Sequence, residues 1–391
     1  MHLRFLIFSA LLPCFTLSAT AQKPEHIYGK NKRLMPVAYN QQQAGLWKEV
    51  VNKDPKNADA WLNYYTASRN AYVVGQEGEN PDSRGSQRFA RFDSIVNAME
   101  KHVPGTFEYD LVKWANGYND PSLLPYLEKA HALAPQRPEP YMALITAYER
   151  MGKDSLRDAL CKAYLQLGDF SPGLLSYGYN LLEGQQPNAV LFAHGDKDSE
   201  AIWLIQHGMG IREDVQLLNL DLLLAKDYRE RVFKNMNVPQ LSYDPLSSDA
   251  DFARYQQYIV SHVAAALPGR PIYVSLSADG PYTLPISGAL HLTGLAYRYS
   301  TAPFDPLPEL IDNYVSRYAL YNLTHPAEED GDIAVDNVHQ FDANYLPSLF
   351  MIIDHYATSG DEEAMKKFKD IARQVAADAG RSNEFETHFK K

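Results

Sequence analysis

Six consecutive polar residues form the stretch of this sequence best suited to chemistry. They are His194, Gly195, Asp196, Lys197, Asp198 and Ser199. Asp196 and Asp198 form an Asp-x-Asp pair, and paired carboxylates can hold a divalent cation together with a sugar nucleotide. His194 beside Asp196 could act as a general base. The same residues could instead form only a tight turn at Gly195 and a helix cap at Asp198 or Ser199.

The residues around this corner predict the elements that position it. The apolar run Val190–Ala193 precedes it, a helical pattern through Trp203 follows, and a second apolar run spans Val215–Leu224. This order indicates strand, turn, helix and strand. Parallel strands place ligand sites at their carboxyl ends, so polar residues of the second run are expected to approach the corner across the sheet. The ligand-binding candidates are therefore His194, Gly195, Asp196, Asp198, Ser199, Asn219 and Asp221, with Asp196 and Asp198 as candidate metal ligands.

The sequence assigns no catalytic residue and no cofactor. It contains no Gly-x-Ser-x-Gly elbow, no His-Glu-x-x-His motif and no glycine-rich phosphate loop. Arg212 and Asp214 are expected to pair with each other or to cap backbone groups. Cys161 lies in an amphipathic helical pattern and is expected in the core.

Further strands and helices are predicted downstream of the corner. A helix over Phe252–Ala266 precedes a third strand at Ile272–Leu276, and Gly288–Tyr299 is a fourth. The order predicts a small, mainly parallel sheet covered by helices. Residues 307–325 are expected as one helix. A helical hairpin over 347–358 and 361–377 then turns at Gly360, and the charged last residues are expected to fray.

The first half of the chain shows a 34-residue period. The period separates successive prolines at Pro104, Pro138 and Pro172, and it also separates Phe107 from Tyr141. Trp61 joins the register if the loop-like Gly75–Ser86 is an insertion of 12 residues. This period resembles that of tetratricopeptide repeats, whose stacked helical hairpins leave a concave surface. The resemblance implies a groove for a partner protein or peptide, although the helices could equally pack only on the next domain.

Residues 188–228 resemble a second family, the soluble C-terminal tail of bacterial membrane proteins related to transmembrane-260-type protein O-mannosyltransferases. The matching residues are Gly195, Asp196, Asp198, Ser199, Trp203, Gln206, Gly210, Arg212, Asp214, Val215, Asn219, Leu220, Leu222 and Leu223. Residues 294–298 resemble a later strand of that tail. Lys197 and Ser199 replace Asn and Thr of the family pattern, and Glu200-Ala201 replaces Phe-Pro. The membrane half that would carry glycosyl transfer has no counterpart here, so the resemblance implies the fold of the tail and not the activity.

The N-terminus predicts export. Arg4 precedes an apolar stretch over Phe5–Leu17, and Ala19-Thr20-Ala21 fits a signal-peptidase site. Cys14 raises the alternative of a lipoprotein, but the preceding Pro13 fits lipidation poorly. No other segment has the ~18 apolar residues that a membrane span requires. The expected product is a soluble periplasmic or extracellular protein, and its net charge of −11 gives no electrostatic support for nucleic-acid binding.

These patterns predict a helical tetratricopeptide-like solenoid, a small mainly parallel α/β sheet domain and a C-terminal helical hairpin. The expected divisions are a signal peptide (1–21), a leader (22–40), helical repeats (41–185), the α/β domain (186–305) and C-terminal helices (306–391). The favoured function is a non-enzymatic interaction or scaffold module of the cell envelope. The alternative is a glycan- or sugar-nucleotide-related enzyme or binder that uses the Asp196-Lys197-Asp198 corner.

Overall fold

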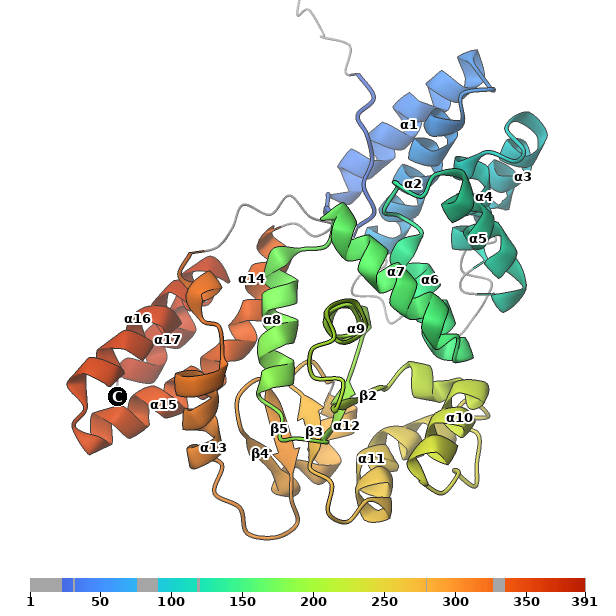
Figure 1. Cartoon of the computed structure of the whole chain (residues 1–391). Coiled ribbons are helices and arrows are strands. Elements are labelled where there is room, and N and C mark those ends of the chain that lie inside the picture. Colours follow the sequence, from blue (N-terminus) through green and yellow to red (C-terminus); the bar gives the residue numbers. More distant parts are fainter. Residues whose placement is uncertain are drawn as a thin grey trace, which may run out of the picture.

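The computed structural model describes most of the chain after the predicted signal peptide. The described residues are 23–30, 32–75, 91–117, 120–278, 280–325 and 335–390. The signal peptide and all but the first residue of the expected insertion at 75–86 lie outside these ranges. Figure 1 shows a helical body made by the first half of the chain, a sheet with helices on both faces, and a group of C-terminal helices beside the sheet. None of the described helices is both long and apolar enough to cross a bilayer.

From Val37 onward, the described part of the first half is built of helices joined by short connections. They are α1 (Val37–Lys53), α2 (Ala58–Gly75), α3 (Asp93–His102), α4 (Phe107–Asn116), α5 (Leu124–Leu133), α6 (Tyr141–Met151), α7 (Asp154–Leu167) and α8 (Pro172–Glu183). Consecutive helices pack in pairs, α1 on α2, α4 on α5 and α6 on α7. The helical half is thus confirmed, whereas its assignment to tetratricopeptide repeats stays a prediction.

The segment expected as a leader packs against the first helix pair. The backbone N–H of Ile27 donates to Asn63 Oδ1 at 2.7 Å, and Asn70 Nδ2 donates to the carbonyl of Tyr28 at 2.8 Å. Ile27 is itself buried. Residues 23–30 therefore belong to the packed helical body.

The sheet has five strands in the order β2-β1-β3-β5-β4. They are β1 (Val190–Ala193), β2 (Gln216–Asn219), β3 (Ile272–Ser275), β4 (Leu290–Leu292) and β5 (Ala296–Tyr299). β1 pairs in parallel with β2 and β3, whereas β5 pairs antiparallel with β3 and β4. The predicted combination of helices with a small α/β sheet is confirmed, but the sheet is mixed rather than mainly parallel.

Two of the predicted strands differ from the structure by more than one residue, each for a local reason, while β3 ends one residue before the predicted Leu276. The expected fourth strand is the hairpin β4–β5, because Gly294 at φ 145° turns the chain between them. The second strand ends at Asn219 rather than at Leu224. Asn219 Oδ1 accepts a hydrogen bond from the backbone N–H of Leu222 at 2.8 Å, and this turn leads into a short 3-10 helix.

Helices cover both faces of the parallel strands. α8 and α9 (Asp196–Trp203) pack on one face with Leu191, Ala193 and Tyr273. α10 (Lys226–Met236) and α11 (Asp249–Ala266) pack on the other face. The strand side chains on that face alternate along each strand with those on the first face, and they are Val190, Phe192, Leu218 and Val274. Burial on both faces explains why β1 reads as an uninterrupted apolar run.

A π-helical turn, Leu204–Gly208, continues α9 and lies against the segment that enters β2. Gln206 in this turn is buried, and its Nε2 donates to the carbonyl oxygens of Arg212 at 2.7 Å and Val215 at 2.8 Å. The turn is therefore fastened to the chain as it enters β2.

The C-terminal helices include the expected hairpin, α15 (Leu346–Ser359) and α16 (Glu362–Asp378), joined at Gly360 with φ 80°. The helix expected over 307–325 is interrupted. α13 ends at Asp312, a π-helical turn follows, and Asn180 of α8 then binds both backbone groups of Ala319, at 2.7 and 3.1 Å. The terminus expected to fray forms α17 (Ser382–Phe389), because Phe385 is buried against the hairpin. The remaining helix of this group is α14 (Val335–Asp342).

Candidate functional site

The polar corner lies at the carboxyl edge of the three parallel strands. β1 ends at Ala193, which pairs with Asn219 at the end of β2, and β3 ends beside it at Ser275. After β1 the chain turns into α9 on one face, whereas after β3 it turns into α12 (Gly280–Thr283), which packs against α11 on the other face. Neighbouring strands whose connections leave to opposite faces form the switch point where open α/β sheets bind ligands.

Asp198 is the most buried carboxyl group of the corner, with 1% of its surface exposed. Its Oδ2 accepts hydrogen bonds from Ser275 Oγ, at 2.6 Å, and from Ser277 Oγ. Its Oδ1 has no hydrogen-bond donor among the described residues. Burial raises the pKa of Asp198 above 3.8, although the two serine hydroxyls and His194 oppose that shift.

The prediction that Asp198 or Ser199 caps the helix is wrong. α9 begins two residues earlier, at Asp196, and its cap position is Gly195 with φ 84° and no side-chain cap. A positive φ at this position requires glycine, since an L side chain is strained there. Gly195 thus lets the chain turn sharply out of β1, which directs Asp198 towards β3.

Ser199 and Asn219 hold the corner together from inside. Asn219 Nδ2 donates to Ser199 Oγ at 2.8 Å and to the carbonyl of Gly195 at 3.3 Å. Ser199 Oγ donates to the same carbonyl at 3.3 Å. Both side chains are buried, so they shape the site rather than face solvent.

His194, Asp196 and Asp221 form the outer part of the corner. His194 Nε2 lies 3.4 Å from Asp221 Oδ1, and the backbone N–H of Gly195 donates to Asp221 Oδ2 at 3.3 Å. Asp196 reaches solvent. The surrounding protein nevertheless raises the pKa of Asp196, and the nearby charge of Asp221 raises it further, while Lys197 lowers it. Proximity of these carboxylates makes the corner acidic.

The structure therefore brings the seven candidate residues into one corner but divides them between an inner and an outer set. Asp196 and Asp198 are two positions apart on a helix, and such positions do not face one another. Within the described ranges, no group of three His, Cys, Asp or Glu side chains is placed to hold a metal ion. Metal binding at Asp196 and Asp198 stays a hypothesis.

Three residues of the site were missed in the sequence. Ser275 and Ser277 are two positions apart at the end of the third apolar run, a spacing that places both side chains on the same face of a strand. This spacing could have identified them from the sequence. Tyr177 of α8 was not predicted; its hydroxyl accepts from Asn344 Nδ2 at 3.2 Å, and burial, followed by the charge of Asp198, raises its pKa. A Cβ on the next residue, Gly178, would lie 2.8 Å from the Ala201 side chain. That glycine lets α8 approach α9 and brings Tyr177 near Asp198.

A second polar cluster lies at the opposite edge, where the parallel strands begin. Arg212 binds Asp214, with Nε 2.9 Å from Oδ1, and donates to the carbonyl oxygens of Leu182, at 2.7 Å, and Gln185, at 3.1 Å. Asp214 Oδ2 also accepts from the backbone N–H of Asn188 at 2.9 Å. Arg212 and Asp214 were expected to pair with each other or to cap backbone groups, and in the structure they do both. Cys161 is buried, as expected, and burial raises its pKa to about 12.

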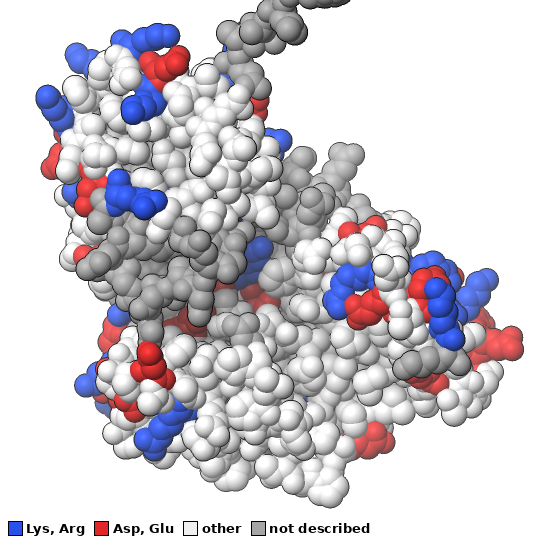
Figure 2. All heavy atoms as spheres, turned by 180° about the vertical axis from the view of Figure 1, so that it is seen from behind, with Lys and Arg blue, Asp and Glu red and all other residues white. Residues whose placement is uncertain are grey.

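Charged side chains of both signs are mixed on the face of the molecule seen in Figure 2. Figure 2 shows Lys and Arg lying next to Asp and Glu on the face seen there, with a broad area of other residues across its lower part. Attraction of a polyanion requires basic side chains clustered on one face, and this face has both signs interleaved.

Comparison with known proteins supports one of the two resemblances. Among curated proteins, none matches this chain. Residues 174–266 match the model of a protein family described as TMEM260-associated domain 2. The matched segment runs from within α8 to the last residue of α11 and so contains β1, the corner and β2. This part of the chain is similar to the TMEM260-associated domain, in agreement with the resemblance found at residues 188–228.

Proposed function

We propose that this chain is an exported binding module of the cell envelope, which takes up a small polar ligand at the corner without transforming it. The observation that carries this proposal is the unpaired Oδ1 of Asp198, buried at a switch point of the sheet. A buried acceptor without a donor costs about 1–3 kcal/mol. A ligand hydroxyl or amine that donates to Oδ1 would recover this free energy. The signal-peptide pattern of residues 1–21 supports export.

Binding is favoured over catalysis because the inner residues are engaged with one another. Asn219 fixes the turn after β2, and the two serines of the β3 end hold Asp198. No cysteine lies at the corner, since the one cysteine of the described chain is the buried Cys161. A ligand could therefore be held here without an activated nucleophile beside it.

A ligand titration with the Asp198→Asn variant tests this proposal. The variant keeps an oxygen for the serine hydroxyls but places an amide N–H₂, a donor, where the unpaired acceptor was. We expect a sugar nucleotide to bind the native chain in isothermal titration calorimetry and the variant to bind about tenfold more weakly. Asp249→Asn, at the start of α11, is the matched control. Equal binding by the native chain and Asp198→Asn would refute the proposal.

The helical half supports a second role as a docking surface for a partner protein. Three consecutive helices, α5, α6 and α7, each expose about half of one large apolar side chain: Leu133, Met151 and Leu156. Cross-linkers placed at these positions should capture one partner in the producing cells. Cross-linkers at the similarly exposed Leu246 and Leu284 of the α/β half should not. The same yield at both sets of positions would argue against a specific docking surface.

The contact between His194 and Asp221 favours one alternative, a glycan-related enzyme. A histidine oriented by a carboxylate can act as a general base, and the exposed Asp196 lies beside it. This alternative predicts that the native chain releases sugar from a sugar nucleotide, with or without Mg²⁺ or Mn²⁺. His194→Ala should abolish the release. Absence of product from the native chain under all of these conditions would exclude hydrolysis of these sugar nucleotides.

A further inference from the structure

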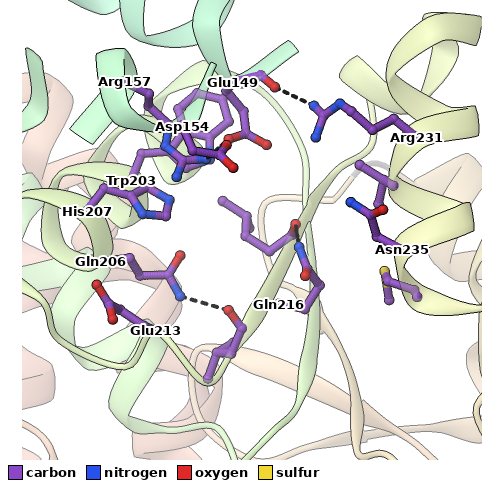
Figure 3. Close-up of a pocket in the computed structure, with 14 residues that line it drawn as sticks. Glu149, Asp154, Arg157, Trp203, Gln206, His207, Glu213, Gln216, Arg231 and Asn235 are labelled. Carbon is purple, nitrogen blue, oxygen red and sulfur yellow. Dashed lines mark hydrogen bonds and ion pairs between the residues drawn. The ribbon is translucent and has the colours of Figure 1, made fainter. Parts of the chain in front are cut away.

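A cavity of about 220 Å³ lies where the helical half meets the α/β half (Figure 3). α6 and α7 contribute Glu149 and Arg157, the π-helical turn contributes His207, and α10 contributes Arg231 and Asn235. Glu213 lines the cavity from the segment that enters β2. This volume is below the ~300–1,000 Å³ typical of sites for drug-sized ligands. The cavity therefore suits a molecule of a single ring rather than a nucleotide.

The basic side chains of the cavity are already occupied by the protein. Arg157 pairs with Glu149 and with Asp154, at 3.2 Å, and its Nε donates to Asp158 Oδ1 at 2.9 Å. Arg231 donates to the backbone carbonyl oxygen of Glu149, an interaction drawn in Figure 3. Neither guanidinium group is therefore readily available to an anionic ligand.

One acceptor of the cavity, the Glu213 carboxylate, is more available than the donors, whereas Glu149 and Asp154 pair with Arg157. Glu213 is exposed, and no described residue forms an ion pair with it. Three carboxylates (Glu149, Asp154 and Glu213) line the cavity against two guanidinium groups. Burial lowers the pKa of His207, and the charge of Arg157 lowers it further, while Asp158, Glu149 and Glu213 oppose the shift. The imidazole is thus neutral near pH 7, and the lining carries a net negative charge.

We propose that this cavity binds a small hydroxylated ammonium compound about the size of one sugar ring. Its ammonium group would pair with the Glu213 carboxylate, and its hydroxyl groups would exchange hydrogen bonds with the Asn235 and Gln216 amides. The buried Trp203, together with Val215 and Val232, supplies an apolar wall for the ring carbons.

The cavity also joins the two halves of the chain, so its ligand would stabilise their contact. α6 packs against α10, and Arg150 of α6 is 3.2 Å from Asp227 of α10. A ligand that contacts both α10 and the lining residues of α6 and α7 would be released when these helices separate. Because binding is linked to this contact, saturating ligand should raise the melting temperature of the whole chain.

Three single-ring sugars with different charges test the proposal. Glucosamine, glucose and glucuronate are titrated into the full chain by isothermal titration calorimetry, below the pKa of the glucosamine amine. We expect glucosamine to bind most tightly, glucose more weakly, and glucuronate not to bind. Binding of glucuronate equal to that of glucosamine, or no binding of glucosamine, would overturn the proposal.

Variants then locate the bound probe. Glu213→Gln should weaken glucosamine binding about tenfold, because a charge-assisted hydrogen bond is replaced by a neutral one. Glu230→Gln, on α10 but outside the cavity lining, is the matched control and should bind as the native chain does. The Asp198→Asn variant separates this cavity from the corner: it should bind glucosamine normally. Loss of glucosamine binding in Asp198→Asn, with no change in Glu213→Gln, would place the probe in the corner and reject the cavity.

Discussion

The two edges of the parallel strands both carry aspartate side chains, but the protein engages these carboxylates fully at one edge and only partly at the other. At the amino edge, Arg212 neutralises Asp214, and that carboxylate also accepts a backbone N–H. At the carboxyl edge, Asp198 is buried with one unpaired oxygen, and Asp196 lies close to the charge of Asp221. The pKa of Asp214 is lowered, chiefly by its hydrogen bond from Arg212, while burial raises the pKa of Asp198. The surrounding protein, followed by the charge of Asp221, raises the pKa of Asp196.

This difference separates a structural polar cluster from a candidate binding site. A carboxylate whose two oxygens are both engaged by the protein, as in Asp214, stabilises the fold and offers little for a ligand to bind. A buried acceptor that the fold leaves unmatched destabilises the protein, and such groups are often found at functional sites. The amino edge is therefore expected to govern stability, and the carboxyl edge is expected to govern binding.

The largest effect on stability is expected at Arg212. Arg212→Ala removes the ion pair with Asp214 and the hydrogen bonds to the carbonyl oxygens of Leu182 and Gln185. We expect the free energy of unfolding to fall by about 3 kcal/mol, measured by urea denaturation. Arg212→Lys should recover only part of this loss, since an ammonium group does not reproduce the fork of the guanidinium. An unchanged denaturation midpoint in Arg212→Ala would remove the contrast between the edges.

The unfolding free energies of Asp214→Asn and Asp198→Asn, each taken relative to the native chain, should change with pH in opposite directions. The folded pKa of Asp214 lies below 3.8, so its contribution is present above pH 3.8 and is lost as pH falls through the folded pKa. Asp214→Asn should therefore cost about 1 kcal/mol near pH 7, a modest value because the pair is partly exposed, and less in acid.

The folded pKa of Asp198 lies above 3.8, so the stability contributed by its protonation is present below pH 3.8 and is lost as pH rises through the folded pKa. The stability of Asp198→Asn relative to the native chain should consequently increase with pH over that interval. Denaturation curves recorded from acid to neutral pH measure both differences. Parallel pH profiles for the two variants would show that the edges do not differ in this respect.

The smallest effect is expected at Asp196, the exposed carboxylate of the corner. Asp196→Asn removes a charge near Asp221 and breaks no hydrogen bond that holds the corner. We expect a change in unfolding free energy within about 0.5 kcal/mol, measured by thermal denaturation at low and high salt. A small gain that disappears at high salt would identify repulsion between the carboxylates. A loss above about 1 kcal/mol would show that Asp196 has a structural role.

Elements with a strong local signal were predicted from the sequence. β1 occupies the predicted run Val190–Ala193, because burial on both faces leaves an uninterrupted apolar segment. Gly360 ends α15 at the predicted position, because glycine readily adopts the left-handed conformation found there. α11 begins slightly before the predicted Phe252, at Asp249, where the Ser248 hydroxyl accepts the N–H of Asp251. Local patterns of this kind were sufficient to predict a helical first half followed by an α/β sheet.

The approach of Asn219 and Asp221 to the corner was predicted, but other features that depend on distant residues were not. Ser275 and Asp198 are 77 positions apart in the sequence, and only the pairing of β1 with β3 brings them together. The break after α13 depends on Asn180, which lies 139 positions before Ala319. The cavity at Glu213 is assembled from several separate elements, so no local spacing indicates it.

The hydrogen bond from Gln206 to the carbonyl of Val215 also bears on how this chain behaves at high concentration. β2 is the outermost strand on its side of the sheet, and exposed strand edges can recruit strands from other molecules. Gln206 occupies the Val215 carbonyl, and the Gln216 side chain occupies that of Leu217 at 3.1 Å. Two glutamine amides thus take the place that a foreign strand would occupy, which protects this side of the sheet from polymerising with its neighbours.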